Sequence, residues 1–186
     1  MDLEGIIDVQ DTTSYWLGHR QIFSNINANQ KYNRKTIVKL EGAEEEIANS
    51  LMTKKPININ WNNFLDYLSP IEFETLGFLI FNTGKSHCSS FRGGTLKNYD
   101  LRVRNNGQYG DLADAFWLQV KKKETNVKRF EEGMYFFHPG KTSIERRIIG
   151  REWIFKIIKN DSEIKKWWDG LFKEYDNIFT LNWNVA

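Results

Sequence analysis

The strongest constraint on folding is a well-marked helix start. The segment "SPIE" at 69–72 places Ser69 as the cap, Pro70 at the first helical position and Glu72 three residues after the cap. This is a capping box with the preferred proline. Apolar residues then recur at helical spacing, at Phe73, Leu76, Gly77 and Ile80. Gly84 can adopt the left-handed conformation that ends helices, so the sequence predicts a helix from Pro70 to near Gly84.

Strand-like segments follow this helix. They are "NYDLRV" (98–103), "AFWLQVK" (115–121), "GMYFFH" (133–138) and "REWIFKII" (151–158). After Asn160 an apolar stripe predicts another helix, and "NIFTLNW" (177–183) alternates as a strand does. Residues 11–68 are typical of helix with asparagine-rich connections. The order predicts a mixed α/β or α+β domain.

Composition narrows the class of protein. The chain has 186 residues, 40% of them hydrophobic, which suits one folded domain over 1–186. Cys88 is the one cysteine, which excludes an internal disulfide and zinc sites built on cysteine pairs, and fits a reducing cytoplasm. The start is acidic and polar, and the apolar stretch at 76–81 is too short to cross a bilayer. We expect a soluble intracellular protein with no membrane partner.

The segment 115–121 poses a question about its polar side chains. Strand alternation puts Gln119 and Lys121 on one face with Trp117, and Leu118 and Val120 on the other. One interpretation is an edge strand whose lysines discourage pairing with another chain. The other is that these polar groups form part of a site.

The site hypothesis depends on an aspartate upstream. Asp100 comes nineteen residues before Gln119, with a glycine-containing connection between them that allows a turn into a neighbouring strand. Phosphodiester hydrolysis needs a hard cation and a positioned water, and Mg²⁺ prefers oxygen ligands. Asp100 would be the principal ligand, aided by the Gln119 amide and the Val120 carbonyl. Lys121 would orient or help deprotonate the attacking water.

These residues resemble the motifs of a known nuclease group. The pattern is similar to the restriction-endonuclease-like PD-(D/E)xK nucleases, in particular the Mrr-like branch, in which glutamine replaces the second acid. "SPIEFETLGFLIFNTG" (69–84) looks like that branch's opening helix, and its matching acid is Glu74. The resemblance implies a mixed β-sheet core flanked by helices over 69–186, with 1–68 as a mainly helical N-terminal part.

The length and motif set most resemble the small catalytic subunit of heterodimeric type IIS restriction endonucleases. The resemblance implies a type II site-specific deoxyribonuclease that uses Mg²⁺, with Mn²⁺ as a substitute. It would cut one strand of double-stranded DNA and leave a 5′-phosphate and a 3′-hydroxyl. A larger subunit, itself a nicking enzyme, would read the sequence, and both would work in the bacterial cytoplasm. Glu74 would bind a metal water or a second metal, and Lys122 and Lys123 would contact DNA.

Each residue also has a structural interpretation. Asp100 can terminate a turn, Glu74 can be a solvated acid, and Lys122 and Lys123 suit a protected edge. The chain as a whole can be a non-catalytic assembly or nucleic-acid-binding module that keeps the nuclease fold. A third alternative is a nuclease that acts on RNA or on repair intermediates.

Overall fold

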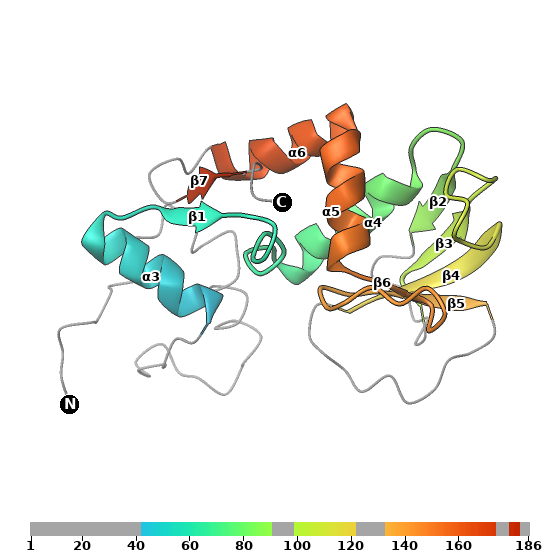
Figure 1. Cartoon of the computed structure of the whole chain (residues 1–186), viewed down its shortest axis with the longest axis horizontal. Helices are drawn as coiled ribbons and strands as arrows, with labels where there is room; N and C mark the ends of the chain where they lie inside the picture. The colour runs from blue at the N-terminus through green and yellow to red at the C-terminus, as the bar shows by residue number, and fades with distance from the viewer. Residues whose placement is uncertain (1–41, 91–98, 122–132, 174–178, 183–186) are drawn as a thin grey trace. The chain divides into compact units, whose positions relative to one another are not determined.

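The computed structural model describes residues 42–90, 99–121, 133–173 and 179–182 (Figure 1). The chain divides into two compact units. The first combines Met1–Ser69 with Asp169–Ala186, and the second is Pro70–Trp168. The expectation of one domain over 1–186, with its core beginning at residue 69, stays a prediction.

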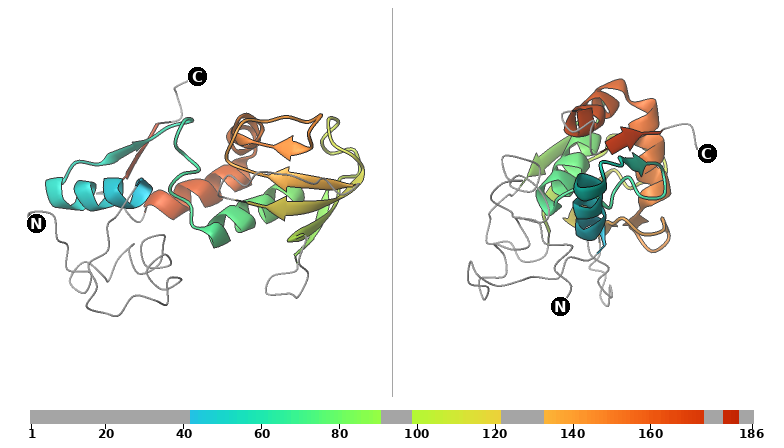
Figure 2. Two further views of the ribbon diagram at one scale, coloured as in Figure 1. Left: turned by 90° about the horizontal axis from the view of Figure 1, so that it is seen from below. Right: turned by 90° about the vertical axis from the view of Figure 1, so that its left-hand side faces the viewer.

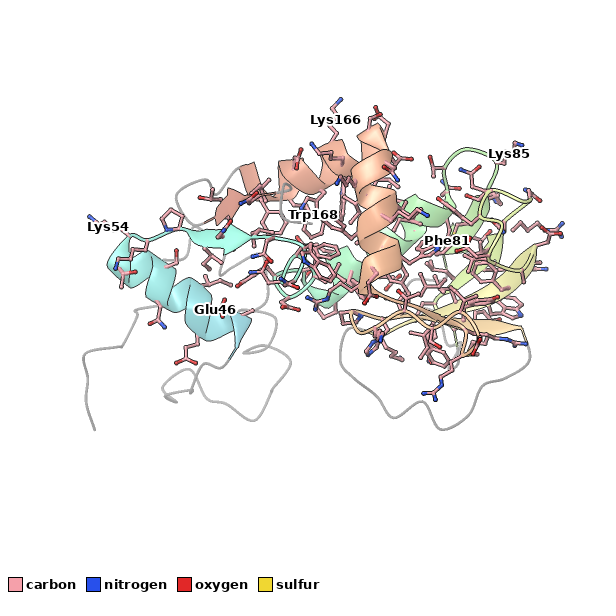
Figure 3. The ribbon with its side chains drawn as sticks, viewed as in Figure 1. Glu46, Lys54, Phe81, Lys85, Lys166 and Trp168 are labelled. Carbon is pink, nitrogen blue, oxygen red and sulfur yellow. The ribbon has the colours of Figure 1, made fainter. Side chains whose placement is uncertain are left out.

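The first unit contains the helix α3 (Ala43–Thr53) and the parallel strands β1 (Ile57–Ile59) and β7 (Phe179–Leu181). The Tyr67 ring lies edge-on to Phe179, with centroids 5.5 Å apart. Its hydroxyl donates to the carboxylate of Glu46, a residue of α3 labelled in Figure 3. The mainly helical character expected of 11–68 is correct for α3 and wrong for β1, because a strand of only three residues gives almost no alternation to detect. Residues 11–41 lie outside the described residues.

The second unit is built on a five-stranded sheet with the order β2-β3-β4-β5-β6. The strands are β2 (His87–Ser90), β3 (Leu101–Arg104), β4 (Ala115–Val120), β5 (Met134–Phe137) and β6 (Ile148–Ile149). β3 runs antiparallel to both of its neighbours, whereas β4, β5 and β6 are parallel. β4 is therefore the central strand, bonded on both sides.

The helix α4 (Pro70–Phe81) packs against one face of this sheet. It begins at Pro70 as expected and ends at Phe81, and Gly84, in the turn that follows, has the expected left-handed conformation with a φ of 58°. At Gly77 a built Cβ would lie 3.5 Å from side-chain atoms of Leu101 and Phe137, an ordinary contact distance, so α4 lies directly on the sheet here. The Phe81 ring, labelled in Figure 3, lies 5.5 Å from Phe116. These contacts form the core of the unit.

The segment 151–158, expected as a strand, is part of the helix α5 (Arg151–Asn160). Its buried residues are Trp153, Ile154 and Ile158, a spacing of one and four that lines one side of a helix. The isoleucines and the tryptophan favoured a strand, but the packing of α5 overrides that preference. The Trp153 ring stacks on Phe81 at 5.8 Å, so α5 covers the same face of the sheet as α4 (Figure 2).

The other predicted helices and strands are present, but each strand is shorter than predicted. The predicted strands at 115–121 and 133–138 are β4 and β5, the helix after Asn160 is α6 (Ser162–Lys173), and β7 lies inside 177–183. The short strands β2 and β6 were not expected. The mixed sheet flanked by helices confirms the expected α+β class at that level. In the part of the chain that the structure describes, no helix has the length and apolar character needed to span a membrane.

Two glycine positions give opposite expectations for alanine. At Gly150 a Cβ would lie 2.4 Å from the Gly140 carbonyl oxygen and 2.5 Å from the Thr142 nitrogen, both backbone atoms. We expect Gly150→Ala to lower the free energy of unfolding by about 1–3 kcal/mol. Gly77→Ala has room and removes a glycine from a helix interior, so it should add about 0.5–1 kcal/mol. Urea titrations of both variants check this, and equal effects would contradict the packing described.

Candidate functional site

Asp100 lies directly before β3, at a break in its pairing with β4. The Asp100 N–H donates to the Leu118 carbonyl at 2.9 Å, while the next residue, Leu101, is the register partner of Leu118. Two successive residues therefore oppose one, which is the arrangement of a β-bulge. The strand expected at 98–103 begins only at Leu101, so Asp100 precedes the strand instead of lying inside it. Bulges of this kind re-aim a side chain.

The re-aimed carboxylate meets the second part of the predicted motif. The Asp100 Oδ2 atom accepts a hydrogen bond of 2.7 Å from the Val120 N–H. Val120 lies between Gln119 and Lys121, so one direct contact joins Asp100 to the "QVK" segment. Asp100 is half-buried, which leaves its carboxylate within reach of solvent.

The position of β4 excludes one of the two interpretations of its polar residues. An edge strand was the simple explanation, but β4 is central, with β3 on one side and β5 on the other. Phe116 and Leu118 are buried, while Trp117 and Gln119 on the opposite face are half-exposed. Lys121 directly follows the strand, and its N–H donates to the Phe137 carbonyl at 2.9 Å. Protection of an edge therefore does not explain Lys121.

The donor atoms at this place are oxygens. Within the described residues, the Asp100 carboxylate accepts only the hydrogen bond from Val120, so lone pairs remain for a ligand. The Gln119 amide and the Val120 carbonyl belong to the adjoining segment. Carboxylate, amide and carbonyl oxygens suit Mg²⁺, which keeps several waters and needs few protein ligands. No three His, Cys, Asp or Glu side chains gather as a metal site anywhere in the described ranges. The donor set fits Mg²⁺ as one carboxylate with neutral oxygens.

For three other predicted site residues, the described part of the chain shows no contact with Asp100. Glu74 is half-exposed on α4, which packs on the sheet face opposite the one that carries Gln119. Lys122 and Lys123 lie outside the described residues. The contact that the structure shows among the predicted residues is the one between Asp100 and Val120, whose chain neighbours are Gln119 and Lys121.

Sequence reasoning missed an aromatic and cationic cluster beside Asp100. The Trp117 ring lies 4.1 Å from the Tyr99 ring, measured between centroids, and the Arg102 guanidinium carbon is 5.0 Å from the Trp117 centroid. Arg102 and Trp117 are register partners across β3 and β4. Strand alternation could have placed Arg102 and Arg104 on one face, but the partner strand and its register could not be read from the sequence.

The cysteine does not offer an alternative nucleophile. Cys88 is 3% exposed in β2, and burial raises the pKa of its thiol to about 12. A thiol nucleophile needs a lowered pKa and access to solvent. The Cys88 thiol is therefore protonated at neutral pH and packs as part of the core.

Comparison with known proteins adds no relative. No family model matches the chain, and no curated protein or solved structure matches it either.

The Asp100–Val120 contact predicts different effects for two substitutions of Asp100. Asp100→Asn keeps an oxygen that can accept from the Val120 N–H, so it should change the free energy of unfolding by less than about 1 kcal/mol. Asp100→Ala leaves that N–H without its partner and should cost about 1–2 kcal/mol. Urea denaturation of both variants measures the difference. Equal stability of the two would show that the carboxylate does not hold this junction.

Proposed function

We propose that this chain is a Mg²⁺-dependent DNA endonuclease subunit. It hydrolyses one DNA strand, leaving a 5′-phosphate and a 3′-hydroxyl, within a heterodimeric type IIS restriction endonuclease of the bacterial cytoplasm. The observation that carries the proposal is the hydrogen bond from the Val120 N–H to Asp100, since it joins the two halves of the predicted D…QxK motif. The antiparallel pairing of β3 with β4 supplies the frame that this motif needs.

Each residue has a role in this proposal. Asp100, the Gln119 amide and the Val120 carbonyl would hold Mg²⁺, which when bound neutralises charge on the phosphate. The half-exposed Lys121, directly after β4, orients the attacking water and stabilises negative charge that develops on the phosphate. Glu74 supports the site from α4. Lys122 and Lys123, next in the chain, contact the DNA backbone.

Sequence recognition is assigned to a larger partner subunit. The sequence has no helix-turn-helix or zinc-finger pattern that would read bases. The formal net charge is only +2, so affinity for DNA would rest on few phosphate contacts and fall steeply with salt. A partner that reads the sequence supplies both the missing specificity and the missing affinity.

The test is cleavage of supercoiled plasmid with Mg²⁺, by the chain alone and mixed with a large nicking subunit. The wild-type mixture should cut both strands, whereas Asp100→Asn and Lys121→Ala should leave only nicks and lower second-strand cleavage about 100-fold or more. Lys156→Ala, at an exposed lysine of α5, is the matched control and should cut as the wild type does. Double-strand cleavage by the Asp100 and Lys121 variants would refute the proposal.

A second function has one observation in its favour. The Asp100 carboxylate already has a structural task, because it accepts the Val120 N–H where the backbone pairing ends. Position 119 also carries a neutral amide in place of an acid. A non-catalytic nuclease-fold module that binds nucleic acid or assembles with a partner would keep this hydrogen bond without using a metal.

Metal-dependent stability separates the two functions. A site that binds Mg²⁺ only in the folded state adds about 1.4 kcal/mol at ten times the dissociation constant, or about 3–6 °C in the thermal midpoint. We expect this rise for the wild type with Mg²⁺ or Mn²⁺. Asp100→Asn should abolish it while its midpoint without metal stays close to that of the wild type. A midpoint that metal does not move in the wild type favours the non-catalytic module.

A further inference from the structure

The exposed side of strands β2, β3 and β4 carries cations. We call it the outer face, and its residues are His87, Ser89, Arg102, Arg104, Ala115, Trp117 and Gln119. The strand β3 alternates strictly, with Leu101 and Val103 buried and Arg102 and Arg104 exposed. The helices α4 and α5 of the second unit both pack on the opposite face. Among the described residues, these two helices therefore leave the outer face uncovered.

We propose that the outer face docks the phosphate backbone of double-stranded DNA, with Arg102 and Arg104 as its phosphate contacts. This inference rests on the proposed function and names the surface that would bring the substrate to Asp100. The charged residues at the outward positions of β2, β3 and β4 are both arginines, and none is acidic. Within the described residues neither arginine forms an ion pair, so both guanidinium groups remain available. Their planar forks match phosphate oxygens in pairs.

Arg102 is held in place by its neighbours. Its guanidinium carbon lies 5.0 Å from the centre of the Trp117 ring, within range of a cation–π interaction. The same indole packs against Tyr99 at 4.1 Å. An arginine that is already ordered loses less side-chain entropy when it binds a ligand. The indole is engaged by these two side chains, which favours phosphate contact over the stacking of an unpaired base on Trp117.

The two arginines continue the line that begins at the candidate site. Residues two apart in a strand lie on one face, about 6.8 Å from each other. Arg102 and Arg104 therefore extend from the bulge at Asp100 along β3, while Gln119 lies beside Trp117 on the same face of β4. A DNA backbone that reaches the bulge before β3 would run its flanking phosphates over Arg102 and then Arg104.

The test is binding of a fluorescein-labelled DNA duplex by the full chain, measured by anisotropy in EDTA over a range of salt. The double variant Arg102→Gln/Arg104→Gln should bind about tenfold more weakly at low salt. The slope of log K against log salt should become shallower by about 1.8, which is about 0.9 for each lost phosphate contact. The control variant Arg146→Gln/Lys156→Gln removes the same charge at exposed positions outside β2, β3 and β4, and it should keep the wild-type slope.

Several results would overturn the proposal. One is an equal loss in the control variant, since the arginines would then act through net charge alone. Another is a wild type that binds no duplex at low salt, which would point to a protein partner for the outer face. Tighter binding of a single-stranded oligonucleotide that depends on Trp117 would point to base stacking. If binding depends on the two arginines and no plasmid is cut, the docking surface stands and the nuclease function fails.

Discussion

The candidate site depends on how the pairing of β3 with β4 ends. Between Leu101 and Arg104 the two strands pair residue by residue, and just before Leu101 the bulge replaces this regular ladder. A backbone N–H that loses its ladder partner needs another acceptor. The Asp100 carboxylate supplies it for Val120. The same hydrogen bond ends the ladder and places a negative charge beside the "QVK" segment, so folding and the proposed chemistry draw on one side chain.

Some of this architecture was predictable because it depends on residues that are close together in the sequence. The proline and the apolar spacing of α4 act within one helix, and the structure has that helix from Pro70 to Phe81, with Gly84 left-handed in the turn that follows. The alternation of β4 likewise follows from neighbouring residues. The prediction of a strand at 151–158 was wrong because the β-branched and aromatic residues there favour a strand, while their spacing fits a helix. Packing against Phe81 decides between the two. Such a decision comes from tertiary contacts that a local pattern does not contain.

The candidate site shows the same division. Alternation gave the shared face of Trp117 and Gln119, and the glycine-containing connection gave the return of the chain from Asp100 towards Gln119. Two features were beyond reach: the bulge that turns the Asp100 side chain, and the central place of β4, which removes the edge interpretation of Lys121. Both depend on register and strand order, which involve residues far apart in the chain. The contact between Arg102 and Trp117 was not predicted for the same reason, because it joins residues on two different strands.

The buried thiol of Cys88 gives the sheet a built-in reporter of its own motion. Among the described strands β2 lies at the edge of the sheet and pairs with β3, and edge elements open locally more readily than the centre of a fold. Cys88 is the one cysteine of the chain, and the folded state keeps it 3% exposed. The rate at which a thiol reagent modifies the unaltered protein therefore measures how often this edge opens, either because β2 leaves β3 or because α4 leaves the sheet. Compared with the rate of global unfolding, the rate of this opening reports the local stability of the sheet edge beside the strand that carries Arg102 and Arg104.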